Sequence, residues 1–322
     1  TSTLVELMLK EKPTHISVVF DLAGSAEREA DYADYKAGRQ EIPEDIIFAV
    51  PYIKDIISAW HIPILEYSGY EADDIIGTIA KKKAAEGHVV FMVTPDKDYA
   101  QLVEDKIFIY KPARLGNDVE IMGVEEVKQK WEVESPLQVI DILGLMGDAV
   151  DNIPGIPKVG EVTAKKLVKE YGSVENVIAN AEHIKGKLGE SIKENADKGL
   201  LSKKLCTNKL QVPIDVSDDD LKMSEPDREK LSAIFAELEF RTLGKRILGE
   251  TYTANQPGVS QAPVVPSIVP GAQQNLFGAA ENTTTIHEVV RGKNAANTPH
   301  TYHVVEGEAA IKKLVDTLQA KK

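Results

Sequence analysis

The sequence predicts an α/β core with a mostly parallel sheet flanked by helices, followed by a helical subdomain. Two observations point to this fold class. Up to residue 122, short β-branched and aromatic segments alternate with amphipathic segments of helical spacing, and this alternation favours parallel strands covered by helices. From 123 to 250, helical spacing continues between short Gly/Pro turns. We therefore divide this part of the chain into a core, 1–122, and a helical subdomain, 123–250.

Strands and helices are expected to take turns along the core. Buried strands are predicted at 15–20 and 89–94, and further strands at 63–67 and 106–110. Helices are predicted at 1–12, 45–60, 71–86 and 97–103. The segment 22–45 is polar and charged with little apolar periodicity, so we expect it to be exposed and mobile.

The second half of the chain contains three kinds of sequence. Helices of the subdomain are expected near 123–131, 136–146, 161–171, 173–180, 197–206, 226–237 and 241–249. Residues 251–300 are rich in Pro, Gly, Gln, Asn, Ala and Ser, which is typical of a flexible linker. Residues 301–322 offer one strand and one helix, too little to bury a core, so we expect them to open a truncated further domain.

The composition excludes several classes of protein. One cysteine, Cys206, rules out an internal disulfide framework and a cysteine-rich zinc site. No apolar stretch approaches the length of about eighteen residues that a membrane helix needs, and the start has no signal-peptide profile, so a cytoplasmic location is expected. The net charge of −13 argues against nucleic-acid binding, unless the acids gather where metal ions neutralise them.

The acids do gather, at the ends of predicted strands and the starts of helices. Four short motifs supply eight carboxylates: Asp21, Glu71, Asp73, Asp74, Asp96, Asp98, Asp148 and Asp151. Any one of them alone could be a cap or turn residue. Ligand sites in open α/β sheets form beyond the carboxyl ends of the strands, and eight converging carboxylates would repel without a cation. The pattern favours two Mg²⁺ or Mn²⁺ ions and metal-assisted phosphodiester hydrolysis.

Two groups of basic residues could meet a nucleic acid. Gly155 and Gly160 bracket a tight turn before a helix, where backbone N–H groups can hold a phosphate, and Lys158, Lys165 and Lys166 make this hairpin locally positive. The alternative for this hairpin is a helical turn with a solvated lysine face.

The second basic group lies on the segment 22–45. It carries Arg28, Lys36 and Arg39 among tyrosines, a combination suited to a threaded nucleic-acid strand. The alternative here is a plain solvated loop.

Five motifs in order carry a family resemblance. They are Val-Val-Phe-Asp21, Tyr35-Lys36-Ala37-Gly38-Arg39, Gly-Tyr-Glu71-Ala-Asp73-Asp74, Thr-Pro-Asp96-Lys-Asp98 and Gly-Asp148-Ala-Val-Asp151-Asn-Ile-Pro-Gly155. Over residues 1–250 the chain resembles the 5′–3′ exonuclease domains of bacterial DNA polymerases I, in the flap endonuclease superfamily. The tail 301–322 is similar to the start of their 3′–5′ exonuclease-like domain.

The resemblance implies a PIN-like fold, a monomer, and two-metal cleavage of 5′ flaps and of nicked or gapped DNA. It implies that the eight carboxylates are metal ligands or lie next to them. It implies that Lys36 and Arg39, on a helical arch, contact the scissile strand as catalytic groups, with Arg28 also touching DNA. The hairpin around Gly155 and Gly160 would be the helix-two-turn-helix element that grips duplex DNA, often around a monovalent cation such as K⁺.

The chain also departs from the family pattern. The family begins with a strand that carries a metal-binding Asp, and this sequence starts after it, so we expect lower stability and weak or no activity. Gly38 stands where Asn is usual and Lys158 where Gly is common, and both changes should be tolerated.

Other functions and one further partner stay open at this point. Without the first strand, the chain could be a structure-specific DNA-binding fragment that does not cut. Asp21 could instead be the nucleophile of a haloacid-dehalogenase-type phosphohydrolase, although Ala23 stands where that chemistry needs a second Asp. Gln273-Gln274-Asn275-Leu276-Phe277 resembles the peptides that dock on the bacterial sliding clamp.

Overall fold

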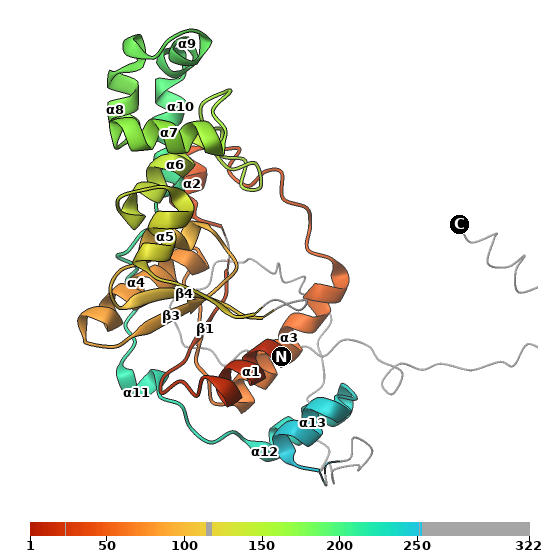
Figure 1. Ribbon diagram of the computed structural model, residues 1–322. Helices are drawn as coiled ribbons and strands as arrows, with labels where there is room; N and C mark the ends of the chain where they lie inside the picture. The colour runs from red at the N-terminus through yellow and green to blue at the C-terminus, as the bar shows by residue number, and fades with distance from the viewer. Residues whose placement is uncertain (23, 114–117, 251, 253–322) are drawn as a thin grey trace, which may run out of the picture.

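The computed structural model describes residues 1–22, 24–113, 118–250 and 252. The expected linker 251–300, apart from residue 252, lies outside these residues. So do the clamp-like peptide Gln273–Phe277 and the tail 301–322. The described part confirms the predicted fold class, an α/β core followed by helices (Figure 1).

The core alternates helices and strands largely as expected. Its helices are α1 (Ser2–Lys10), α2 (Ala26–Asp31), α3 (Glu44–Ala59), α4 (Ala72–Ala85) and the 3₁₀ turn η1 (Asp98–Leu102). Its strands are β1 (Val18–Val19), β2 (Ile64–Leu65), β3 (Val90–Val93), β4 (Ile107–Lys111) and β5 (Glu120–Met122).

The strands form two sheets, not the single sheet that the sequence predicts. β1 and β2 pair in parallel, while β3 pairs in parallel with β4, and β4 pairs antiparallel with the unpredicted β5. Helix α4 packs against β1, β3 and β4 and so joins the two sheets. The predicted strand at 89–94 is present as β3, but it is buried on one face only. Met92 is buried, whereas Phe91 and Val93 are each 46% exposed.

The helical subdomain packs around α6 (Val139–Met146), whose first seven residues are all buried. The other helices are α5 (Val124–Trp131), α7 (Glu161–Tyr171), α8 (Val174–Ala179), α9 (Lys187–Glu194), α10 (Ala196–Cys206) and two 3₁₀ turns, η2 (Pro136–Gln138) and η3 (Ala181–His183). The sequence did not predict α9. At Gly144 a Cβ atom would lie 2.9 Å from the Lys203 Cα atom, so this glycine lets α6 and α10 approach closely.

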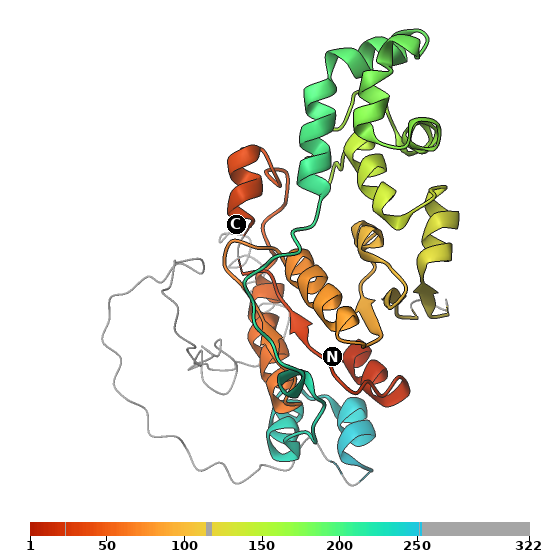
Figure 2. The same ribbon diagram turned by 90° about the vertical axis from the view of Figure 1, so that its left-hand side faces the viewer.

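After α10 the chain runs back along the core, which the domain prediction missed. It passes through α11 (Asp218–Leu221) and ends in α12 (Arg228–Glu237) and α13 (Arg241–Leu248), beside α3 and α1 (Figure 2). Leu231 and Phe235 of α12 are completely buried in a second apolar cluster with Val5 and Ile56. The last two helices of the predicted subdomain therefore pack on the core, because their apolar faces complete the cover of α1 and α3.

Among the described residues, no helix is both long enough and apolar enough to span a membrane.

Candidate active site

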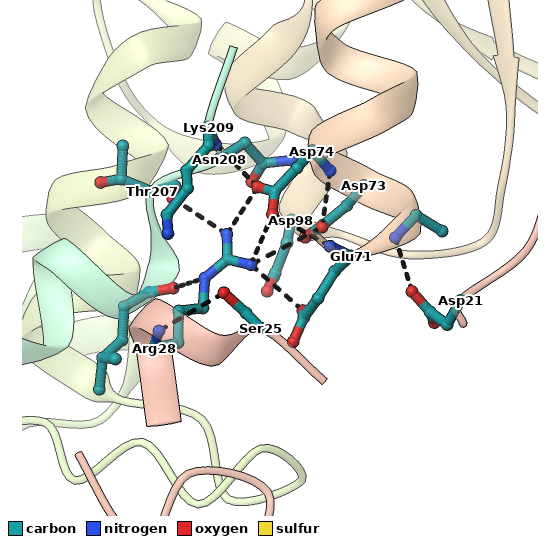
Figure 3. A network of polar contacts seen from close by, with 12 residues as sticks. Asp21, Ser25, Arg28, Glu71, Asp73, Asp74, Asp98, Thr207, Asn208 and Lys209 are labelled. Atoms are coloured by element: carbon teal, nitrogen blue, oxygen red, sulfur yellow. Dashed lines mark hydrogen bonds and ion pairs between the residues drawn. The ribbon is translucent and has the colours of Figure 1, made fainter. Parts of the chain in front are cut away.

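The first four carboxylates meet at the N-terminus of α4. Glu71 is the N-cap residue, and Asp73 and Asp74 lie in the first turn. Asp21, two residues after the end of β1, accepts a 2.6 Å hydrogen bond from the Ala72 backbone N–H. The helix dipole favours negative charge at this end, so local helix formation brings the acids of two separate motifs to one place (Figure 3).

The other four carboxylates lie after β3 and after α6. The Asp98 backbone N–H donates to the Asp96 carboxylate, and the Asp148 carboxylate accepts from the backbone N–H groups of Val150 and Asp151. Lys97 joins the two motifs, because its Nζ atom lies 2.8 Å from Asp148 Oδ2.

The arch segment, which we define as residues 24–43 between β1 and α3, connects both groups of carboxylates. Lys36 Nζ lies 2.6 Å from Glu71 Oε2 and 3.8 Å from Asp151 Oδ2. Arg39 contacts the same Asp151 at 2.7 Å. One ammonium group thus lies within ion-pair distance of a carboxylate from each group, Glu71 and Asp151.

Most residues of the arch segment are exposed, as the sequence predicts. The segment nevertheless begins with helix α2, and the side chains of Ser25, Arg28 and Tyr35 are buried. Arg28 is only 3% exposed and both of its terminal nitrogens bind Asp74, at 2.8 and 2.9 Å. The prediction that Arg28 lies ready for DNA is therefore wrong, because its guanidinium is already enclosed by partners.

Burial and like charges shift the pKa of two carboxyls in the site. The pKa of Asp73 is raised to about 7 by burial and by Asp74 and Glu71, although Arg28 opposes the shift. The pKa of Asp98 is raised to about 7 by burial and by Asp96, with Asp148 and Asp151 adding to it. For Asp148, burial would raise the pKa, but the hydrogen bonds from Lys97 and from backbone N–H groups outweigh it and lower the pKa.

The residues present fit divalent cations on two observations. Glu71 Oε1 and Asp98 Oδ1 are buried carboxylate oxygens that have no hydrogen-bond donor among the described residues, and buried charges need a partner. The four motifs also supply eight carboxyl groups against four cationic side chains, those of Arg28, Lys36, Arg39 and Lys97. This excess of acidic over basic groups favours a bound divalent cation.

The carboxylates are arranged loosely. Among the described residues, no three of the eight bring ligand oxygens within 4.8 Å of one another. The only three acidic, histidine or cysteine residues of the described chain that do so are Glu86, His88 and Asp218, at the opposite end of α4. Repulsion between the carboxylates, and the cationic side chains between them, account for the open arrangement.

Asp74 differs from the other seven carboxylates. It is fully buried, and its two oxygens accept hydrogen bonds from Arg28 and from the backbone N–H groups of Glu71 and Lys209. These contacts use its lone pairs within the protein, so the geometry does not support Asp74 as a metal ligand.

The predicted DNA-binding hairpin divides into internal and exposed groups. The Gly155 N–H donates to Ser202 Oγ at 2.9 Å inside the protein, so the prediction that it holds a phosphate is wrong. Lys165 is paired with Glu161 and lies over the Trp131 ring. Gly160, the N-cap of α7, is exposed.

The remaining basic residues of this hairpin are the ones on the surface. Lys158 and Lys166 are both exposed, and α7 begins between them. They are the two lysines of the hairpin that remain available to a phosphate.

Two residues of the site were missed in the sequence. Lys97 stands inside the Asp96–Asp98 motif, and Tyr35, whose hydroxyl donates to Glu71 Oε2 at 3.2 Å, directly precedes Lys36. The position of Lys97 and Tyr35 next to motif residues could have indicated that they belong to the site. The direction of their side chains, however, depends on how the arch segment folds.

Comparisons with known proteins show the family to which the chain belongs. Residues 1–132 match the 5′–3′ exonuclease N-terminal resolvase-like domain, and residues 134–229 match the 5′–3′ exonuclease C-terminal SAM fold. The chain is 40% identical over 244 residues to a 5′–3′ exonuclease of Aquifex aeolicus, a match that covers 76% of this chain and 82% of that one.

Longer relatives and solved structures extend the comparison. DNA polymerase I of Bacillus subtilis is 40% identical over 254 residues, 79% of this chain and 29% of the polymerase, so the chain spans less than a third of that relative. The 5′-exonuclease of phage T5 with bound zinc ions has a similar fold, with a TM-score of 0.54 and 19% identity over 77% of this chain and 88% of that one. The phage T5 D15 flap endonuclease in a product complex with DNA and metal ions has the same TM-score and coverage, at 22% identity.

Proposed function

Because this chain belongs to the 5′–3′ exonuclease family, we propose that it is a metal-dependent nuclease that hydrolyses phosphodiester bonds of DNA at 5′ ends and 5′ flaps. The observation that carries the proposal is the position of Lys36, whose ammonium touches Glu71 and Asp151 at once. A phosphate group bound among these carboxylates would lie within reach of the arch cations.

The metal-binding part of the proposal assigns seven carboxylates, with Asp74 left out. Glu71, Asp73 and Asp21 at the start of α4 would hold one ion, and the four carboxylates after β3 and α6 would hold the other. Mg²⁺ or Mn²⁺ is the expected metal, because both prefer oxygen ligands. Two such ions supply an activated water and stabilise the charge of the leaving oxygen.

The protein's own side chains prepare the substrate. Lys36 and Arg39 form ion pairs with Glu71 and Asp151 in the metal-free protein, and both cations would be available to the scissile phosphate once divalent ions neutralise these carboxylates. Two cations aimed at a phosphoryl group stabilise the negative charge that develops in the transition state. Tyr35 donates a 3.2 Å hydrogen bond to the Glu71 carboxylate. This bond would keep the Glu71 side chain in place after Lys36 has moved to the phosphate.

The DNA-binding part of the proposal rests on the hairpin before α7. Lys158, Lys166 and the exposed N-terminus of α7 would hold the phosphates of the duplex without reading bases. A K⁺ ion at this hairpin, a monomeric state and a cytoplasmic location belong to the same proposal.

Two assays on defined DNA test the function. The chain is incubated with a 5′-flap substrate and with a blunt duplex, once in Mg²⁺ for cleavage and once in Ca²⁺ for binding. We expect slow, Mg²⁺-dependent cleavage at the flap junction, abolished in Asp98→Asn and retained in Asp215→Asn, an exposed acid outside the site. Flap binding without any cleavage would instead favour the DNA-binding fragment.

The phosphohydrolase alternative is not retained. Family membership over residues 1–229 accounts for Asp21 as one of the acids at the start of α4. An aspartyl-phosphate trapped on Asp21 would reverse this conclusion.

A further inference from the structure

Arg28 makes more polar contacts across the site than the other cationic groups around the carboxylates. Besides the paired bonds of Arg28 to Asp74, its Nη1 atom lies 3.3 Å from Glu71 Oε2. Arg28 Nε donates to the Leu205 carbonyl and Nη2 to the Thr207 carbonyl, both at 3.1 Å. Figure 3 shows the guanidinium enclosed between α4 and the segment that leaves α10. One side chain of the arch therefore contacts both the carboxylates and the helical subdomain.

The surroundings of Arg28 bind the same three segments together. The Lys209 backbone N–H donates to Asp74 Oδ1 at 2.7 Å. At the exposed rim, Lys209 pairs with Glu27 and Lys204 pairs with Asp31, both across the α2–α10 junction. Exposed ion pairs of this kind contribute little to the free energy of unfolding. A buried arginine that binds a carboxylate with two hydrogen bonds is strongly held, and its removal is strongly destabilising.

The junction also connects to the DNA-binding hairpin through α10. Ser202, on the same helix as Leu205, accepts the internal hydrogen bond from Gly155. On the other side, the Lys36 N–H donates to the Asp151 carbonyl and Asn152 Nδ2 donates to the Asp34 carbonyl. The arch segment is thus fixed at its base by Arg28 and at its tip by the residues after α6.

We infer that Arg28 is a positioning residue: it locks the base of the arch to α4 and to the end of α10, so that Lys36 and Arg39 are held over the carboxylates. It acts through other residues and does not itself contact DNA. The inference rests on the proposed function only where it concerns DNA, because the lock itself is a property of the free protein.

The lock is tested by hydrogen exchange on the chain without metal or DNA. In Arg28→Gln, the amides of residues 26–39 should exchange at least about tenfold faster, while those of α6 stay protected. Arg28→Lys should restore part of the protection, because it keeps the charge without the two-pronged contact. Lys204→Ala, which removes only a rim pair, is the matched control and should leave the arch unchanged.

A second variant guards against misfolding. Arg28→Gln leaves the buried Asp74 carboxylate with two backbone N–H donors but without its counter-ion, so the double variant Arg28→Gln/Asp74→Asn replaces the ion pair by two neutral amides. Its fold should recover while the arch still exchanges fast, because the contacts to Glu71 and to the carbonyls are weakened. If the arch of this double variant is as protected as that of the parent, the inference is wrong.

Binding of a 5′-flap DNA in Ca²⁺ separates positioning from direct contact. The double substitution Lys36→Ala/Arg39→Ala should reduce the affinity for flap DNA. If Arg28 positions the arch, this reduction should be smaller in the Arg28→Gln background, and a mutant cycle measures the difference. If Arg28 touched a phosphate, the effects would add, and that result would overturn the inference. Failure of the chain to bind flap DNA at all would count against the proposed function and leave the exchange result standing.

Discussion

The Lys36 ammonium lies 2.6 Å from the Glu71 carboxylate, at the N-terminus of α4. The arch therefore brings its own cation to the place where a divalent ion is expected. On the proposed function, a divalent ion would compete with Lys36 for the Glu71 carboxylate, and the released lysine would then contact a substrate phosphate. These two proposed roles of Lys36, counter-ion of Glu71 and phosphate contact, lead to the first prediction.

Lys36→Met should affect metal and DNA binding in opposite directions. Without DNA, affinity for Mn²⁺ or Ca²⁺ should rise about fivefold, because removing a competing ion pair is worth roughly 1 kcal/mol. Binding of 5′-flap DNA in Ca²⁺ should weaken. Calorimetric titration of the metal and a fluorescence assay of the DNA measure the two effects. The control is Lys81→Met, which removes an ion pair between α4 and Glu104 away from the site. If the affinities of Lys36→Met for metal and for DNA both rise or both fall, the proposed competition is wrong.

Metal affinity should depend strongly on pH near neutrality. Asp73 and Asp98 have pKa values raised from 3.8 to about 7, and a bound divalent ion must displace their protons. Below pH 7 the apparent affinity should rise by about tenfold per pH unit for each proton released. Asp73→Asn should reduce the slope of log affinity against pH by about one, and a flat profile between pH 5.5 and 7 in the parent would contradict the assignment.

The stability of the metal-free protein should change with pH in the opposite sense. Because these two carboxyls bind protons more tightly in the folded state, their contribution is fully present below pH 4 and is lost as pH rises to 7. The unfolding temperature of the metal-free chain should therefore fall over this range by a larger amount than that of Asp73→Asn. Thermal unfolding with a chelator present measures the fall in unfolding temperature of the parent and of Asp73→Asn. Saturating Mg²⁺ should remove the difference between the two proteins.

Gly155 and Gly160 share a sequence motif but should respond differently to alanine. Gly155 has φ +59°, and a Cβ atom there would lie 2.5 Å from the Gly147 nitrogen, so Gly155→Ala should cost at least about 2 kcal/mol. Gly160 has φ −94° and open space at the Cβ position, so Gly160→Ala should cost only the N-cap preference for glycine over alanine, about 0.5–1 kcal/mol. Denaturant unfolding measures the stability of both variants. Equal losses of stability would contradict the close approach of Gly155 to the backbone of Gly147.

The sequence predicts the order of elements well and the exposure of particular residues less well. The periodicity of 71–86 predicts α4, and the acids at its start already indicate the site. Arg28 lies in a polar stretch with no apolar period, so nothing local shows that its partners are Asp74 and the carbonyls of Leu205 and Thr207. Contacts between residues so far apart in the sequence follow from tertiary packing, which a local pattern does not encode.

Glycine motifs show the same limit. The pattern Gly155 to Gly160 predicts a tight turn before α7 correctly, yet it gives both glycines the same role. Whether an N–H group faces solvent or Ser202 depends on where α10 lies. The two sheets and the return of α12 to α3 are likewise set by burial of apolar faces across the whole chain.

Lys158 has a strained backbone conformation and a charge that is expected to contact DNA. Substitution by glycine relieves the strain and removes the charge, so its effects on stability and on DNA binding can be measured separately. Its φ of +71° is in the left-handed region, where a side chain costs about 1 kcal/mol. Lys158→Gly should therefore raise the unfolding temperature by about 2–4 °C and lower the salt dependence of duplex binding by about one phosphate contact. Lys166→Ala, an exposed lysine within α7, should lower the salt dependence equally without the gain in stability. If both variants have the parent's salt dependence, the hairpin does not hold the duplex.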